Sequence, residues 1–233
     1  MIYIAIADGL NRLSENNNEK WDCRVMRQPQ SLLPEKIIDY IENTSNEGVK
    51  KERFFAYTAL GLCLKEFFDV SDWNIKRTEC GKPYLTDILG DPLLCSTAPK
   101  SKLEVSLSHS DGVAVVALSN EGEIGVDIQA EVDEKKAERL DKRFLKDVEP
   151  KNDNMNVRYF YLNLGDEKCS ITEIFPKISL QSDFLTKWTF AESVIKCFGL
   201  TFSDISKVNE LSKKVKSQTV LFESYKITTT SAI

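Results

Sequence analysis

The hydrophobic and polar positions at the start of the chain predict a strand followed by two helices. Residues 1–7 are almost continuously apolar and give way at once to polar residues, which is typical of a buried strand. Pro34, a residue favoured at the start of helices, begins the first helix. A second, amphipathic helix begins near Lys50, because apolar residues then recur three and four positions apart. They are Ala56, Leu60, Cys63, Leu64 and Phe67.

The expected start of this second helix carries a cluster of positive charge. Lys50, Lys51 and Arg53 lie in its first turn, where the helix dipole disfavours cations. The positive charges of this turn therefore disfavour the helix that the apolar spacing predicts. Such a local inconsistency is expected at functional or strained sites.

Alternating apolar and polar positions predict a sheet in the middle of the chain. Residues 103–108 and 113–118 form two strands that are close enough along the chain to be hairpin neighbours. Residues 124–128 are expected to continue the same sheet. Residues 133–146 lie in a strongly charged stretch and are predicted to form a solvated helix.

The last third of the chain predicts one long helix between less regular segments. Residues 150–180 show neither the helical nor the strand period of apolar residues. A helix follows over residues 180–200, and Gly199 ends it. Residues 201–233 are expected to form short strands. The prediction for the whole chain is an α+β fold.

Composition and charge exclude several classes of protein. The chain has 233 residues, 42% hydrophobic and 29% charged, so it can bury a core and is unlike a disordered protein. A formal net charge of −5 argues against a general nucleic-acid-binding surface. No apolar stretch is long enough to cross a bilayer and no basic region precedes the first one, so we expect a cytoplasmic protein without membrane contact. Six scattered cysteines lack zinc-site spacing and are expected to be reduced.

The first segment that can do chemistry surrounds the only histidine. His109 lies between Ser108 and Ser110, where a predicted strand meets a turn. A lone histidine is more often structural. With the two hydroxyls and the backbone N–H groups of the turn, however, it also makes a compact anion site.

The second segment places an acid within a strand. Strand alternation puts Gly125, Asp127 and Gln129 on one face. Asp127 either points to solvent or holds a cation. The carboxylate and amide oxygens of Asp127 and Gln129 suit Mg²⁺, which takes few protein ligands and keeps several waters.

The third segment is part of the long helix. Trp188, Glu192 and Lys196 are four residues apart and share one helical face. Glu192 and Lys196 could be an exposed ion pair, which would contribute only roughly 0.2–0.5 kcal/mol. Trp188, Ile195 and Phe198 instead make this helix substantially buried, and charged groups near a buried face need partners.

Four short motifs in this order resemble those of the 4′-phosphopantetheinyl transferase superfamily, of the surfactin-synthetase-activating, double-length type. They are Gly81-Lys82-Pro83, Ser108-His109-Ser110, Gly125-Val126-Asp127-Ile128 and the helix from Trp188 to Lys196. The likeness extends to Pro34-Glu35-Lys36, the Arg53 helix and Lys142-Arg143-Phe144. It covers most of the chain, but residues 150–180 and the C-terminal strands align poorly.

The resemblance implies transfer of the phosphopantetheine arm of coenzyme A (CoA) to a serine of an apo carrier protein, with release of adenosine 3′,5′-bisphosphate. It implies two similar halves related by a pseudo-twofold axis, residues 1–122 and 123–233, each a small, mainly antiparallel sheet on a long helix. The first half would bind CoA and the second would carry the metal and the catalytic helix. A monomer is expected, because both halves of the site lie in one chain.

The resemblance also implies a role for each site residue. It places Lys36 and Arg53 at the 3′-phosphate, Gly81, Lys82 and Pro83 at the adenine and phosphate region, and Ser108, His109 and Lys196 at phosphate oxygens. Asp127, Gln129 and Glu192 would bind Mg²⁺ on the pyrophosphate. Glu192, or a metal-bound water that it orients, would take the proton of the carrier serine, and Lys196 would share in proton transfer.

Two residues depart from the family pattern. Gln129 stands where many relatives have a second acid, and Ala191 stands where a lysine usually precedes the glutamate. A relative that binds CoA or a carrier protein without transferring the arm is therefore the competing interpretation, and a structural domain with coincidental motifs ranks last.

The sequence leaves open whether the carrier is a peptidyl or an acyl carrier protein. The double-length resemblance implies secondary-metabolite synthetases. Fatty-acid acyl carriers are strongly acidic, so a protein of net charge −5 would bind peptidyl carriers more readily unless it has a local basic patch.

Overall fold

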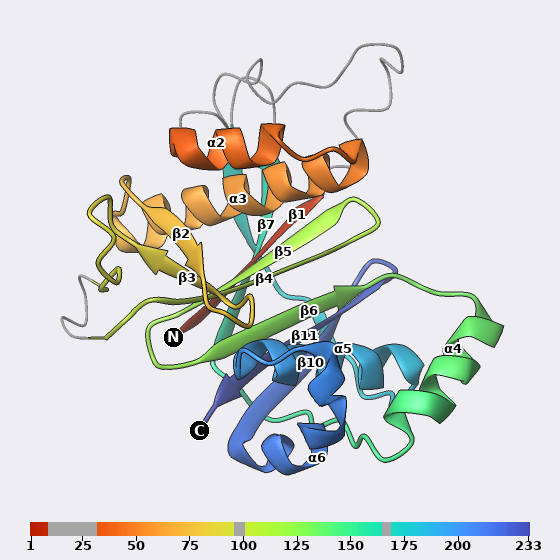
Figure 1. Cartoon of the computed structure of the whole chain (residues 1–233). Coiled ribbons are helices and arrows are strands. Elements are labelled where there is room, and N and C mark those ends of the chain that lie inside the picture. Colours follow the sequence, from red (N-terminus) through yellow and green to blue (C-terminus); the bar gives the residue numbers. More distant parts are fainter. Residues whose placement is uncertain (9–31, 96–100, 165–168) are drawn as a thin grey trace.

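A computed structural model describes residues 1–8, 32–95, 101–164 and 169–233 of the chain. Figure 1 shows helices on either side of two sheets that lie between them. Cys23 lies outside the described residues. The α+β class is confirmed, with mixed strand directions.

The first sheet has five strands in the order β4-β5-β1-β7-β8. The strands are β4 (Glu104–Ser110), β5 (Val113–Ser119), β1 (Ile2–Asp8), β7 (Val157–Leu164) and β8 (Cys169–Ile174). The hairpin that the sequence predicts is confirmed, since β4 pairs antiparallel with β5. Strand β1 lies at the centre, antiparallel to β5 and parallel to β7.

The centre of this sheet is buried on both faces, as the nearly continuous apolar residues of β1 and β5 require. Two helices, α2 (Glu35–Glu42) and α3 (Glu47–Phe68), cover one face (Figure 1). Ala5, Val116 and Phe160 point into the core beneath them. Ile4 and Val115 point the opposite way, into a second core that the first sheet shares with the second sheet.

The second sheet has four strands in the order β6-β11-β10-β9. They are β6 (Ile124–Gln129), β11 (Tyr225–Ala232), β10 (Val215–Phe222) and β9 (Lys177–Ile178). The expectation that residues 124–128 continue the first sheet is wrong, because β6 pairs with β11, where Asp127 lies opposite Thr228. Val126 and Ile128 still pack against the first sheet, which explains why the apolar pattern suggested membership of it.

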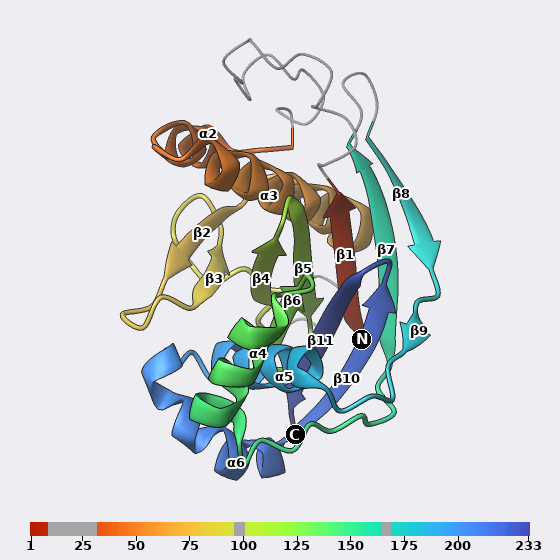
Figure 2. The same cartoon turned by 90° about the vertical axis from the view of Figure 1, so that its right-hand side faces the viewer.

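Helix α5 (Phe184–Cys197) packs on the second sheet and is the predicted long helix. It begins after Asp183, whose Oδ1 accepts hydrogen bonds from the backbone N–H and the hydroxyl of Thr186 at 3.0 Å each. It ends before Gly199, which has φ +64° and so takes the left-handed conformation that commonly ends helices. Figure 2 shows α2 and α3 on one side of the two sheets and α5 on the other.

The structure corrects two further expectations. Residues 150–180, which show no period, contain β7, β8 and β9. Residues 202–207 form a 3-10 helix, followed by α6 (Val208–Leu211), where a strand was expected. The reason is a reciprocal capping box, in which Thr201 and Asp204 satisfy each other's backbone N–H groups.

The charge conflict at the start of the second helix disappears because α3 begins earlier than its apolar spacing suggests. Asn46 caps the helix by accepting a hydrogen bond from the N–H of Val49, and Glu47 supplies an acid to the first turn. Lys50 therefore lies beyond the first turn, where it is buried and pairs with Glu42 at 2.5 Å.

The remaining elements are short. Strands β2 (Asn74–Arg77) and β3 (Pro83–Thr86) form a separate ribbon. Helix α4 (Glu134–Leu140) continues into a π-helical turn (Asp141–Leu145), and α4 buries no residue, as expected for a solvated helix. None of the helices in the described ranges combines the length and apolar character of a membrane span.

The predicted division at residue 122 does not coincide with the sheets, because β7 and β8 join strands that precede residue 122. Two similar halves with a pseudo-twofold axis remain a prediction.

We expect Gly125→Ala to destabilise the protein. An added Cβ would lie 1.9 Å from the carbonyl oxygen of Ser193 and 2.6 Å from the backbone nitrogen of Cys197, so α5 would have to move. The expected cost is roughly 2–3 kcal/mol, a fall in Tm of roughly 5–10 °C by calorimetry. Gly48→Ala is the control, because its Cβ would meet only a side-chain oxygen, at 3.3 Å. Equal effects of the two substitutions would contradict this account.

Candidate functional site

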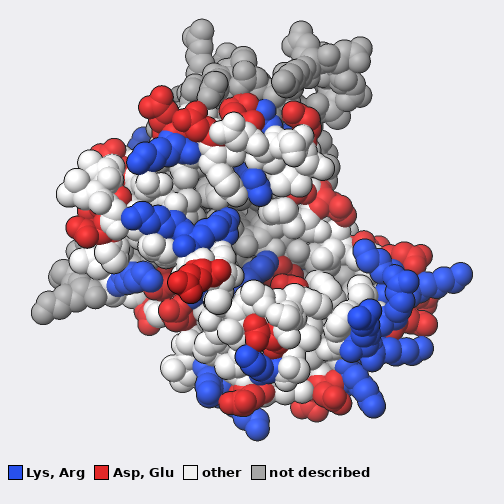
Figure 3. All heavy atoms as spheres, in the orientation of Figure 1, with Lys and Arg blue, Asp and Glu red and all other residues white. Residues whose placement is uncertain are grey.

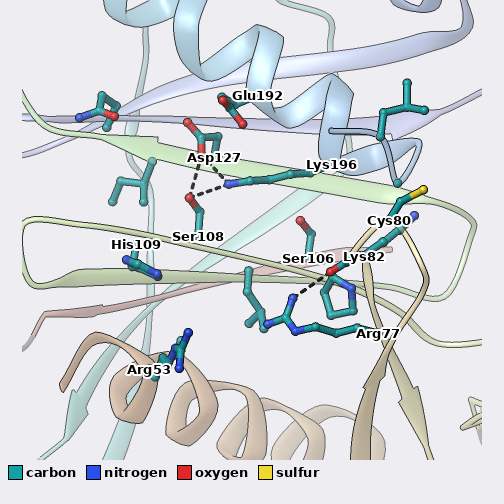
Figure 4. A pocket seen from close by; sticks show the side chains of 18 of the residues that line it. Arg53, Arg77, Cys80, Lys82, Ser106, Ser108, His109, Asp127, Glu192 and Lys196 are labelled. Atoms are coloured by element: carbon teal, nitrogen blue, oxygen red, sulfur yellow. Dashed lines mark hydrogen bonds and ion pairs between the residues drawn. The ribbon is translucent and has the colours of Figure 1, made fainter. Parts of the chain in front are cut away.

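A cavity of about 490 Å³ lies where α3, the β2–β3 ribbon, β4, β6 and α5 meet (Figure 4). It collects nearly all of the site residues that the sequence singles out. The lining includes Arg53, Gly81, Lys82, Pro83, Ser108, His109, Asp127, Gln129, Trp188, Glu192 and Lys196. These residues come from both sides of residue 122, so distant segments of the chain build one site.

Asp127 is the centre of a hydrogen-bonded cluster in this cavity. Its Oδ1 accepts a hydrogen bond from Ser108 Oγ at 2.7 Å and pairs with Lys196 Nζ at 2.6 Å. Lys196 Nζ also donates to Ser108 Oγ at 2.8 Å. Asp127 is only 5% exposed, so the interpretation of a solvent-facing acid is wrong. The charged pair is held by contacts from three elements: β4, β6 and α5.

Glu192 lies beside this cluster, one helical turn before Lys196 (Figure 4). Burial raises the pKa of its carboxyl group, and the negative charge of Asp127 raises it further, while Lys196 opposes the shift. The alternative of an exposed Glu192–Lys196 ion pair is therefore not what the structure contains, because Lys196 pairs with Asp127 instead. A carboxyl group with a raised pKa in a cavity is a better proton acceptor than an ordinary glutamate.

His109 and Gln129 also line the cavity. His109 Nδ1 lies 2.7 Å from an oxygen of Glu52 on α3. The Nε2 group of Gln129 donates to Ser110 Oγ at 3.4 Å, a long hydrogen bond that leaves its amide oxygen available. The ring of His109 is exposed, but the backbone N–H of Gly112 donates to the other oxygen of Glu52 at 3.2 Å, so a carboxylate already occupies part of the predicted anion site.

The opposite wall of the cavity is basic. Arg53 donates to Thr44 Oγ1 at 2.8 Å and lies over the ring of Tyr40, 4.8 Å from its centroid. Lys82 donates to the carbonyl oxygen of Cys197 at 2.6 Å and pairs with Glu123, and burial lowers its pKa. An anion in the cavity would therefore lie between fixed positive groups.

Arg77 is a lining residue that the sequence analysis missed. Its Nη1 group donates to the carbonyl oxygen of Gly81 at 2.9 Å, and it pairs across the ribbon with Pro83. The available signal was the strand that precedes Gly81, since a hairpin returning at Gly81-Lys82-Pro83 brings the preceding strand alongside.

Lys36 is the one predicted site residue that does not line the cavity. It lies exposed on α2, outside the residues that form the wall. Lys36 is therefore not placed to make the predicted contact with a phosphate bound in this cavity.

The oxygen groups of Asp127, Gln129 and Glu192 fit a hard cation. They are two carboxylates and one amide that line the same cavity, and oxygen groups of this kind are the ligands that Mg²⁺ prefers. Within the described residues no group of three or more His, Cys, Asp or Glu side chains is arranged to hold a metal ion.

Comparisons with models of protein families and with curated proteins found no match to this chain.

We expect the stability of the protein to fall as pH rises above the ordinary glutamate pKa, and Glu192→Gln to reduce that fall. Because the folded state holds the pKa of Glu192 above its unfolded value, the native protein binds the proton more tightly and loses stability as it is removed. Denaturant unfolding from pH 4 to 8 would measure this, with exposed Glu210→Gln as the control. Identical pH slopes for wild type and Glu192→Gln would contradict the assignment.

Proposed function

We propose that the chain transfers the 4′-phosphopantetheine arm of CoA to a serine of an apo carrier protein in a Mg²⁺-dependent reaction. One observation carries this proposal: residues of four motifs separated along the sequence line the same cavity, where Asp127 and Glu192 lie beside Lys196 and two arginines, Arg53 and Arg77, lie opposite them (Figure 4). A nucleotide with a pyrophosphate and a further phosphate needs such a combination of local cations and metal-binding acids.

The basic wall would hold the substrate. Arg53, Arg77 and Lys82 offer charge-assisted hydrogen bonds to phosphate oxygens. Ser108 and His109 add donors from β4. Most of these side chains are already fixed by contacts within the protein, so less conformational entropy is lost when the substrate binds.

The proton of the attacking serine would go to Glu192. The serine oxygen forms a bond to the phosphorus that bears the pantetheine arm, the bond from that phosphorus to the bridging oxygen breaks, and adenosine 3′,5′-bisphosphate leaves. Lys196 would move from Asp127 towards phosphate oxygens. Bound at Asp127, Gln129 and Glu192, Mg²⁺ would polarise the attacked phosphorus and neutralise charge on the leaving group.

The proposed activity is tested by incubating the protein with CoA, Mg²⁺ and apo peptidyl or acyl carriers and measuring the intact mass of each carrier. We expect a gain of one phosphopantetheine group with wild type and with the control Glu210→Gln, and its loss with Glu192→Gln. Glu210 is an exposed acid on α6, paired with Lys214 at 3.8 Å, so it matches the charge change without touching the cavity. Wild-type rates in Glu192→Gln would contradict the assigned base.

Binding without transfer is the second candidate function. Two observations favour it. Lys196 already pairs with Asp127, and Gln129 is neutral, so Asp127 and Glu192 are the only two acids among the described residues that line the cavity. A protein that binds CoA but changes no carrier mass would have this function.

Arg53→Ala should weaken CoA binding by roughly 1.5–3 kcal/mol, the usual contribution of a hydrogen bond to a charged group. Dephospho-CoA lacks the 3′-phosphate, so its affinity should barely change. Arg158→Ala is the control, since Arg158 is a partly exposed residue of β7 outside the cavity lining and pairs with Glu173 at 2.8 Å. Calorimetric titration with both ligands measures the difference. Equal losses for both would show that Arg53 does not contact the 3′-phosphate.

Gln129→Glu should strengthen Mg²⁺ binding to the protein in the absence of CoA. The amide adds no charge to Asp127 and Glu192, and Lys196 competes with a cation for Asp127. We therefore expect weak Mg²⁺ binding to wild type, tighter binding when CoA is present, and no activity in Asp127→Ala. Calorimetric titration of Mg²⁺ with and without CoA tests this. Comparable affinity in both conditions would mean that the protein alone completes the site.

A further inference from the structure

Basic and acidic side chains lie on different sides of α4 and of the π-helical turn that follows it. Lys135, Arg139, Lys142 and Lys146 follow one another at intervals of four, three and four residues, so they share one side of the helix. Lys136 and Arg143 flank this row. We call these six residues the basic face. The acids of the same segment, Glu134, Glu138 and Asp141, lie to one side of it.

The basic face is open to solvent. All six side chains are exposed, and Figure 3 shows Lys and Arg gathered over α4 at the right-hand edge of the molecule. Within the described residues, the ion pair of Lys142 with Glu138 spans 3.9 Å between exposed side chains and contributes little. Lys135, Arg139 and Lys146 form no ion pair with other described residues. This face thus offers unpaired positive charge on a protein of net charge −5.

The basic face lies next to the cavity. Strand β6 ends at Gln129, a lining residue, and α4 begins five residues later. Asp141 pairs with Lys187 of α5 at 3.1 Å, and the next residue, Trp188, lines the cavity. The ring of Phe202 lies between Phe144 and Trp188, 5.1 Å and 5.4 Å from their centroids. A partner bound to the basic face would therefore lie beside the cavity.

We propose that the basic face docks the acidic face of a carrier-protein helix, so that the carrier is a strongly acidic, acyl type rather than a less acidic peptidyl type. This inference rests on the proposed function, and it replaces the expectation from net charge alone, since the local patch decides which partner approaches. A protein partner fits better than a nucleic acid. The basic face spans one short helix with acids directly beside it, whereas a phosphate backbone would continue over the acidic surface.

The test compares two double charge reversals that change the net charge equally. Lys135→Glu with Arg139→Glu alters the basic face. Lys213→Glu with Lys216→Glu alters exposed lysines beside and on β10, away from the cavity lining. The probe is a strongly acidic apo acyl carrier protein whose target serine is replaced by alanine, so that binding is measured without transfer. The association rate is measured at about 0.05 M and about 0.5 M salt.

We expect the α4 variant to associate on the order of tenfold more slowly at low salt, with the difference lost at high salt, while the control variant associates like wild type. CoA affinity should be unchanged in both variants, which shows that the cavity is intact. Equal slowing in both variants, unchanged association of the α4 variant, or no binding of the acidic carrier by wild type would overturn the proposal.

Two further probes separate other partners of a basic surface. Vesicles of phosphatidylcholine and phosphatidylserine and a short DNA duplex are tested with the same variants. Binding of either probe that depends on the basic face, without such dependence for the carrier, would overturn the proposal. If the carrier docks as expected but wild type transfers nothing to the carrier with its serine intact, docking stands and the proposed transfer fails.

Discussion

The site depends on how closely α5 approaches β6 at Gly125. A side chain at this position would collide with the backbone of Ser193 and Cys197, so only glycine lets the helix settle this near the strand. Glu192 and Lys196 immediately precede those two residues on the helix, and Asp127 is two residues beyond Gly125 on the same face of the strand. The one close contact therefore determines that two acids and an ammonium group share a cavity. The motif containing Gly125 and Asp127 thus combines a packing requirement with a chemical one.

Acidic and basic side chains line the same cavity of a protein that has an excess of acids. The acids that matter are gathered on β6 and α5, where Lys196 partly neutralises them. Arg53 of α3 and Arg77 of β2 face them across the cavity (Figure 4), whereas Lys82 donates to the carbonyl oxygen of Cys197 at the end of α5. Charge is organised locally in this molecule, so its net value says little about which ligand each surface prefers.

Local pattern was enough to predict most elements, whereas many of the residues that line the cavity were expected only through the resemblance of short motifs to a known family. The hairpin of β4 and β5, the helix α5 and the glycine that ends it follow from periods and turn residues close together in the sequence. The membership of β6 could not be read in this way, because its partner β11 begins about a hundred residues later and both possible sheets would bury Val126 and Ile128. The start of α3 was misplaced because Asn46 and Glu47 precede the first apolar repeat. Arg77 was missed because its place depends on pairing across the ribbon.

The central place of β1 in the first sheet has a consequence for how the chain folds. Its parallel neighbour β7 lies about 150 residues further along, and loop closure over such a distance is slow. Until β7 is synthesised and docks, one edge of β1 exposes unpaired backbone groups along an almost wholly apolar strand. When synthesis has passed residue 122, the edge of β1 that will pair with β7 is therefore still unpaired and able to bind other strands. During synthesis, the period of greatest risk of aggregation lasts until residue 164 has emerged and β7 can close that edge.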